Sequence, residues 1–96
     1  MKVAELKPGM KGVNLVGRIK EVSAPREVMT RLGGMSRVAD AILSDESGAV
    51  KMSLWNEQIE QVKPGDSIRI ENGYVTSFRG EIQLNVGRYG KLSVLE

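Results

Sequence analysis

The sequence is dominated by short stretches in which apolar and polar residues alternate, and residues typical of turns separate these stretches. Alternation with a period of two is typical of β-strands that bury one face. Five such blocks cover residues 12–22, 27–44, 49–55, 67–77 and 81–86. The pattern predicts an all-β protein, and a chain of 96 residues is enough for a single domain, spanning 1–96.

The connections between the blocks carry specific turn chemistry. Lys63-Pro64-Gly65-Asp66 has proline and glycine at the two central positions that suit a type II turn. Asp45-Glu46-Ser47-Gly48 begins with Asp and ends with Gly, and Phe78-Arg79-Gly80 predicts a tight connection. Gly33-Gly34 predicts a hairpin tip or a flexible kink inside the second block, and Gly17 predicts a bulge or a bend in the first.

Only one stretch is typical of a helix, and it lies between the third and fourth blocks. Asn56 is a candidate N-cap, Glu57–Val62 would form the helix, and Pro64 prevents its continuation. Five strands with a short helix between strands 3 and 4 is the connectivity of the OB fold. This fold is a Greek-key barrel that binds oligonucleotides or oligosaccharides. An SH3-like barrel and an open sandwich are the alternatives.

The third block contains the most informative residue. Every second residue in it is apolar, so Lys51, Ser53 and Trp55 are predicted to face outward. A tryptophan on a polar face is unusual for a residue that serves packing alone. Aromatic rings on such a face stack against nucleotide bases of any identity. A bulge at Asn56 that turns Trp55 back into the end of the barrel is the alternative.

Two more aromatic residues, Tyr74 and Phe78, flank the predicted connection between the fourth and fifth blocks. In an OB barrel this connection lies beside the face of strands 2 and 3. Strict alternation from Ile68 and Ile70 would point Tyr74 into the core, whereas a bulge at Gly73 would turn it outward. Phe78 is either a further stacking residue or an anchor for the turn.

Polar and basic residues around this face are candidates for contacts with bases, sugars and phosphates. Gln83 and Asn85 alternate with apolar residues and either hydrogen-bond the ligand or remain solvated. The basic residues nearest to this face either contact phosphate groups of the ligand or make no contact with it. The candidate nucleic-acid-binding residues are Trp55, Tyr74, Phe78, Lys51, Ser53, Arg31, Arg37, Arg79, Gln83 and Asn85.

The composition excludes several kinds of chemistry. The chain has no cysteine and no histidine, which removes most zinc sites, thiol catalysis and Ser-His nucleophile pairs. Asp45 and Glu46 lie in a predicted turn, where Asp serves local backbone hydrogen bonds. We therefore expect no catalytic residue, no metal and no cofactor. The lack of cysteines and of a long apolar run predicts an intracellular, cytoplasmic protein, and binding to DNA would make it nucleoid-associated.

Two long segments of the chain resemble a known family. Ala41–Trp55, with its Asp-Glu-Ser-Gly turn, and Ile70–Gly87, with Phe-Arg-Gly-Glu-Ile-Gln-Leu, resemble archaeal single-stranded DNA-binding proteins. Leu6–Met10 fits the same family. The sequence is similar also to the human simple single-stranded DNA-binding proteins and to archaeal replication protein A. The resemblance covers residues 5–92.

The resemblance implies an OB fold with bases stacked at the end of strand 3 and around the connection between strands 4 and 5. Trp55, Tyr74 and Phe78 fill those positions, so the resemblance favours the bulge at Gly73. Some relatives carry another aromatic residue in place of Asn85. Many relatives continue into a flexible tail that recruits partners. The chain is therefore either a domain of a longer protein or a free-standing small protein.

We predict a monomeric module that binds single-stranded DNA without sequence preference. It would protect exposed strands during replication, repair and recombination, with other replication or repair proteins as further partners. RNA is the alternative ligand for the same surface. The alternative function is an adaptor that binds proteins inside a replication protein A-like complex, for which exposed aromatic rings on one face would be unnecessary.

Overall fold

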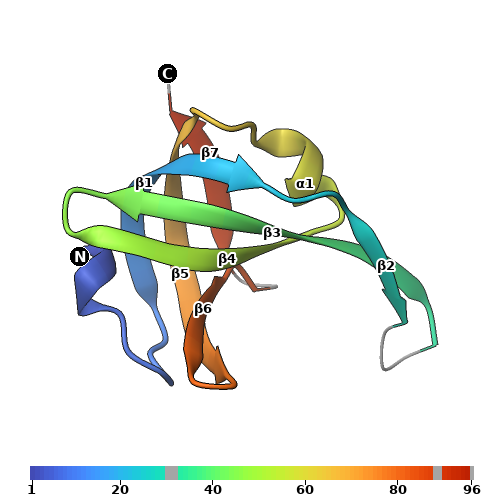
Figure 1. Cartoon of the computed structure of the whole chain (residues 1–96), viewed down its shortest axis with the longest axis horizontal. Helices are drawn as coiled ribbons and strands as arrows, with labels where there is room; N and C mark the ends of the chain where they lie inside the picture. The colour runs from blue at the N-terminus through green and yellow to red at the C-terminus, as the bar shows by residue number, and fades with distance from the viewer. Residues whose placement is uncertain (30–32, 88–89, 96) are drawn as a thin grey trace.

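The computed structural model describes residues 1–29, 33–87 and 90–95, with Phe78 described by its backbone alone. Strands dominate the described part, and a hairpin arm made of β2 and the start of β3 projects from the barrel (Figure 1). The elements in chain order are η1 (Val3–Glu5, a 3₁₀ turn), β1 (Val13–Val22), β2 (Arg26–Met29), β3 (Met35–Asp45), β4 (Gly48–Trp55), α1 (Glu57–Gln61), β5 (Ser67–Phe78), β6 (Glu81–Asn85) and β7 (Lys91–Leu95).

The barrel is a closed ring of strands in the order β1–β3–β4–β6–β5, and β5 pairs again with β1. The pairs are antiparallel except for β4 and β6, which run parallel. These ring strands are the five predicted blocks, and α1 lies between the third and fourth of them. The predicted fold class, a five-stranded OB-fold Greek-key barrel with one short helix, is confirmed.

β2 and β7 lie outside this ring. β2 pairs with the first part of β3, so the second block is a hairpin as predicted, and Met29 lies opposite Met35 near its tip. Nothing in the alternation pattern predicted β7. It pairs with the first part of β5, from Ser67 to Glu71, whereas β6 pairs with the second part. β7 and β6 therefore pair with successive parts of the long strand β5.

Of the two alternatives for Gly17, a bulge or a bend, the bulge is wrong. The register between β1 and β3 shifts between Ile19 and Glu21 instead. Gly17 is buried because β3 approaches it closely: an added Cβ would lie 2.9 Å from both Leu43 Cδ1 and the Ser44 carbonyl oxygen. The glycine therefore provides space for a neighbouring strand, a requirement that the sequence pattern of β1 does not reveal.

The helix α1 matches the predicted position and ends one residue earlier than expected, at Gln61. Asn56 does not cap it through its side chain. The Asn56 Oδ1 atom instead accepts a hydrogen bond of 3.0 Å from the Arg37 backbone N–H, so this side chain ties the end of β4 to β3. Across the described residues, no helix has the length and apolar character needed to cross a membrane.

A bulge in β5 reverses the direction in which its side chains point. Leu15 of β1 pairs with Ile70 and Val13 pairs with Gly73, so β5 has one extra residue between these two pairs. Asn72 has a left-handed backbone conformation, with φ of 56°. Ile68 and Ile70 are buried before the bulge. The predicted outward turn of the strand is confirmed, although the irregular residue is Asn72 and not Gly73.

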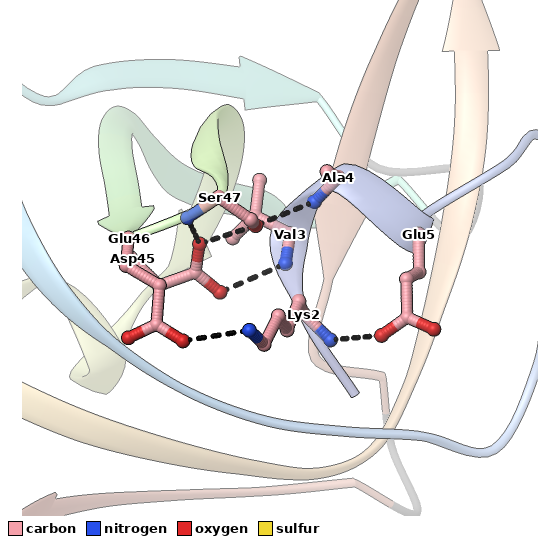
Figure 2. Close-up of polar contacts among 7 residues, drawn as sticks. All are labelled: Lys2, Val3, Ala4, Glu5, Asp45, Glu46 and Ser47. Carbon is pink, nitrogen blue, oxygen red and sulfur yellow. Dashed lines mark hydrogen bonds and ion pairs between the residues drawn. The ribbon is translucent and has the colours of Figure 1, made fainter.

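The N-terminal turn η1 closes one end of the barrel. Val3 belongs to the buried core, together with Leu6 just beyond the turn. Figure 2 shows how the β3–β4 turn holds this segment: Asp45 Oδ2 accepts from the Val3 N–H at 2.9 Å, and Ser47 Oγ accepts from the Ala4 N–H at 2.9 Å. The turn prediction for Asp45 is thus confirmed, since the carboxylate also accepts from the Ser47 N–H at 2.7 Å.

These contacts change the acidity of the Asp45 carboxyl. The hydrogen bond from the Ser47 hydroxyl, followed by that from the Val3 N–H, lowers the pKa of Asp45 to about 2. The ammonium of Lys2 lies 2.8 Å from Glu46 Oε1 and completes the attachment, and the hydrogen bond to Glu46 raises the pKa of Lys2. Asp45 is a structural residue that fixes the N-terminal segment.

Candidate nucleic-acid interface

The candidate residues lie mainly on the outer face of β4, β6 and β5. Neighbouring strands place directly opposed side chains on the same face, within reach of one another. The register of the three strands therefore defines two parallel rows on this face, which we call the outer rows. The first contains Lys51, Gln83 and Thr76, and the second contains Ser53, Asn85 and Tyr74.

Trp55 lies at the end of β4, two residues beyond Ser53 on the same face. It is 38% exposed, so the predicted outward orientation is confirmed and the inward alternative is wrong. Its cross-strand neighbour Val38 is buried, which indicates that one part of the indole packs on the sheet and another part remains open. The backbone N–H of Trp55 donates to Gln58 Oε1 at 3.0 Å, which ties this end of β4 to α1.

Tyr74 lies at the β5 end of the second outer row, and Ser53 lies at its β4 end. Tyr74 is 40% exposed, and its ring rests on the backbone of Gly87, where an added Cβ would come within 2.8 Å of Tyr74 Cε1. Beside the ring is a hollow of about 240 Å³ whose wall includes four glycines: Gly12, Gly73, Gly87 and Gly90. Glycines leave room for a ligand to approach the backbone closely.

A second hollow, of about 430 Å³, lies beside Trp55. Its walls come from α1 and from the beginning of β7, with Gln58 on one side and Leu92 on the other. Gly90 lines this hollow as well as the one beside Tyr74. The two aromatic rings therefore border adjoining depressions, and the strand β7 that the sequence did not predict forms part of the site.

Ser53 and Asn85 face outward as predicted, but they are more covered than alternation suggested. They are only 7% and 8% exposed. Both lie in the middle of the second outer row, where side chains of the neighbouring strands surround them. Gln83, in the first outer row, is half-buried. Position along a strand predicts the face of a side chain, whereas its exposure depends on the neighbouring strands.

The described basic residues among the candidates, Arg37, Lys51 and Arg79, lie in different surroundings. Arg37 lies on the face of β3 opposite to that of Val38, and its Nη2 atom pairs with Glu60 Oε1 of α1 at 3.0 Å. Lys51 lies in the first outer row, with its Nζ atom 3.7 Å from Glu81 Oε2. Arg79 lies at the exposed tip of the β5–β6 turn. Acidic partners thus compensate two of the predicted cations.

Two lysines that sequence reasoning missed line the hollows. Lys11 borders the hollow beside Tyr74, and Lys91 borders the one beside Trp55. Both are exposed, and neither forms an ion pair within the described residues. In the sequence Lys11 is adjacent to Gly12 and Lys91 to Gly90. This adjacency was the sequence signal that could have indicated these two lysines as part of the site.

Two of the predicted contacts fall outside the described residues. Arg31 lies in the part of the β2–β3 connection that the structure does not describe, and the side chain of Phe78 is not described either. The backbone of Phe78 pairs with Glu81 at the end of β5, next to the turn, as predicted. In the described ranges no group of three acidic side chains is placed to hold a metal ion.

A closed five-stranded barrel with this connectivity and with exposed aromatic rings across its outer sheet face defines an OB-fold domain. Residues 6–94 match the family described as single-stranded DNA binding protein Ssb-like, OB fold, and the chain belongs to this family. It is a family of DNA-binding OB-fold proteins and not an enzyme family.

Individual relatives agree with this assignment. The chain is 39% identical over 92 residues to the single-stranded DNA binding protein Ssb of Saccharolobus solfataricus, covering 96% of this chain and 62% of that protein. It is 36% identical over 87 residues to the replication factor A of Methanothermobacter thermautotrophicus, covering 90% of this chain and 11% of that protein. The chain therefore spans only part of the length of both relatives.

Solved structures show the same fold. The replication factor A related protein from Methanobacterium thermoautotrophicum superposes with a TM-score of 0.81 at 26% identity, covering all of this chain and 90% of that one. A replication protein A domain from Methanococcus maripaludis gives a TM-score of 0.79 at 25% identity, covering all of this chain and 94% of that one.

Proposed function

We propose that this domain binds single-stranded DNA with little sequence preference, by stacking bases on Trp55, Tyr74 and Phe78. The observation that supports this proposal most directly is the exposure of Trp55 and Tyr74 on one sheet face, beside adjoining hollows. Stacking on aromatic side chains stabilises a bound strand by about 1–3 kcal/mol per base and tolerates any base. Membership in the Ssb-like family supports the same ligand.

Positive charge at the hollows would add a salt-dependent contribution. Lys11 and Lys91 have no ion pair to break within the described part of the chain, whereas Lys51 must exchange Glu81 for a phosphate. Ser53 and Asn85 lie between Trp55 and Tyr74 and would face the bases, and Gln83 lies beside them in the first outer row. Arg31, Arg37 and Arg79 remain candidates for contacts with phosphate. The biological role that follows is protection of exposed strands during replication, repair and recombination.

Tryptophan fluorescence tests the proposal, because Trp55 is the only tryptophan of the chain. Titration with an oligothymidine of about twelve nucleotides, within the roughly 4–16 nucleotides that one OB fold occupies, should quench the emission strongly at low salt. Raising the salt concentration should weaken binding. An unchanged emission, together with no binding of a labelled oligonucleotide by anisotropy, would contradict the stacking proposal.

A second candidate function is that of a protein-binding adaptor. The hairpin arm favours it, because Met29 and Met35 are 75% and 58% exposed and lie opposite each other. Two sets of variants separate the candidates. Replacing Trp55 and Tyr74 by alanine should abolish DNA binding, whereas replacing Met29 and Met35 by serine should leave it intact. Competition between DNA and RNA oligomers of equal length tests RNA as the ligand.

A further inference from the structure

Asn85 occupies the centre of the proposed binding face. It lies directly across from Tyr74 on one side and from Ser53 on the other. Its chain neighbours Leu84 and Val86 are buried in the barrel core, so the Asn85 side chain is on the outer face. A base stacked on Tyr74 would therefore have the Asn85 amide beside its edge.

The hydrogen bonds of Asn85 fix the orientation of its amide group. The Nδ2 group donates to Thr76 Oγ1 at 3.1 Å and to the Gln83 backbone carbonyl oxygen at 3.4 Å. A carbonyl oxygen can only accept, so the nitrogen of the amide must be on this side. The Oδ1 atom consequently points away from Thr76 and Gln83.

The Oδ1 atom has no hydrogen-bond partner among the described residues, yet it is not sealed from solvent. Beside Tyr74 the face therefore presents an oriented acceptor whose donor group is already occupied. This arrangement differs from that of a freely rotating asparagine, which offers either a donor or an acceptor to a ligand.

We propose that Asn85 discriminates among bases stacked on Tyr74 by accepting a hydrogen bond from an exocyclic amino group. This inference rests on the proposed function. Cytosine, adenine and guanine each have an exocyclic amino group, at N4, N6 and N2, whereas thymine has none and carries the acceptor O4 where cytosine has N4. Two acceptors cannot hydrogen-bond each other, and an unpaired buried polar group weakens binding. Thymine is therefore disfavoured at this position, and cytosine is preferred over it.

Thr76 is a positioning residue in this scheme, because its hydroxyl holds the amide nitrogen. It is exposed and lies in the first outer row next to Gln83. Thr76→Val keeps the shape of the side chain but removes the acceptor for Nδ2. The Asn85 amide can then rotate, so the preference among bases should decrease. Thr76 itself does not face the base beside Tyr74.

The test compares the dissociation constants of dC12 and dT12 at neutral pH for the protein and three variants. Each ratio is taken within one variant, which removes changes that affect all strands equally. Asn85→Ala should reduce the relative preference for dC12 over dT12 by about 3- to 10-fold, the range expected for one uncharged hydrogen bond. Thr76→Val should reduce it in the same direction. Val16→Ala is the control, because Val16 is exposed on β1, outside the outer rows.

The outcomes separate this inference from the proposed function. If neither oligonucleotide binds the unaltered protein, the proposed function is wrong and the inference fails with it. If both bind and the ratio is the same in the protein, in Asn85→Ala and in Thr76→Val, the inference is overturned while DNA binding stands. If Asn85→Ala does not fold, as judged by thermal melting, the exposed variant Thr76→Val decides alone.

Discussion

The contact between Gly87 and Tyr74 leads to a prediction that links backbone packing to DNA affinity. In Gly87→Ala the new Cβ would lie 2.8 Å from Tyr74 Cε1 and 3.3 Å from Cδ1. Carbon atoms in contact are normally about 3.5–4.0 Å apart, so the ring must move by roughly 0.7–1.2 Å. Because Tyr74 is 40% exposed, the ring can move toward solvent, into the space that a stacked base would need.

The expected magnitude follows from the energy of stacking. Complete removal of the ring in Tyr74→Ala should cost about 1–3 kcal/mol, which is about 5- to 150-fold in affinity. A displaced ring retains part of its contact area, so we expect Gly87→Ala to weaken binding by about 3- to 10-fold. The free energy of unfolding should change by less than about 1 kcal/mol, or roughly 4–8 °C in melting temperature, because the ring is not part of the core.

The assay is anisotropy of a labelled oligothymidine with four proteins: the unaltered chain, Gly87→Ala, Tyr74→Ala and the double variant. If Gly87 acts through the ring, its substitution should have little effect once Tyr74 is alanine. An equal loss of affinity in both backgrounds would refute the reasoning. So would a large loss of thermal stability in Gly87→Ala, since the weaker binding would then reflect unfolding.

Three other predictions concern stability and charge. Gly17→Ala should destabilise the fold by about 1–3 kcal/mol, because the added methyl group meets a backbone oxygen that cannot move independently of the sheet. Urea unfolding measures this loss of stability, and Val16→Ala, at the neighbouring exposed position, is the control. The carboxyl of Asp45 has its pKa lowered from 3.8 to about 2 in the folded chain, so its stabilising contribution is complete above about pH 4 and is lost as the pH falls toward 2. The urea midpoint of unfolding should therefore fall less between neutral and acid pH in Asp45→Asn than in the unaltered chain. An equal fall in the two proteins would contradict this prediction. Lys11→Gln and Lys91→Gln should each reduce the magnitude of the slope of log affinity against log salt concentration by about 0.7, and an unchanged slope in both variants would exclude these lysines as phosphate contacts. Glu81→Gln, which frees Lys51, should strengthen binding at low salt.

The ring strands and turns could be predicted because they depend on local chemistry. Alternation located the five ring strands, and proline with glycine located the turn at Lys63–Asp66, where Gly65 has a φ of 96°. The sequence pattern left two orientations open for Tyr74, and the family resemblance favoured the outward one that a bulge produces. The residue that forms the bulge is Asn72, because asparagine also tolerates the left-handed conformation.

Features that depend on a neighbouring strand could not be predicted. Gly17 has no unusual backbone conformation, and its necessity comes from the side chain of Leu43 and the backbone of Ser44. The burial of Ser53 and Asn85 likewise comes from their place between other strands. The sequence pattern did not indicate Lys91 as part of the interface, because β7 was not predicted and only its pairing with β5 brings that end of the chain to Trp55.

The parallel pairing of β4 with β6 has a consequence for the order of folding. Trp55 and Tyr74 belong to strands that become neighbours only through β6, and the ring closes only when β5 reaches β1, which joins Val13 to Gly73. Contacts between residues so distant in sequence form slowly, because a long loop must close before they become favourable. Hairpins such as β3–β4 can form early, but they carry no complete ligand surface. Appearance of DNA-binding activity during refolding should therefore coincide with the final cooperative step, which makes binding a kinetic reporter of barrel closure.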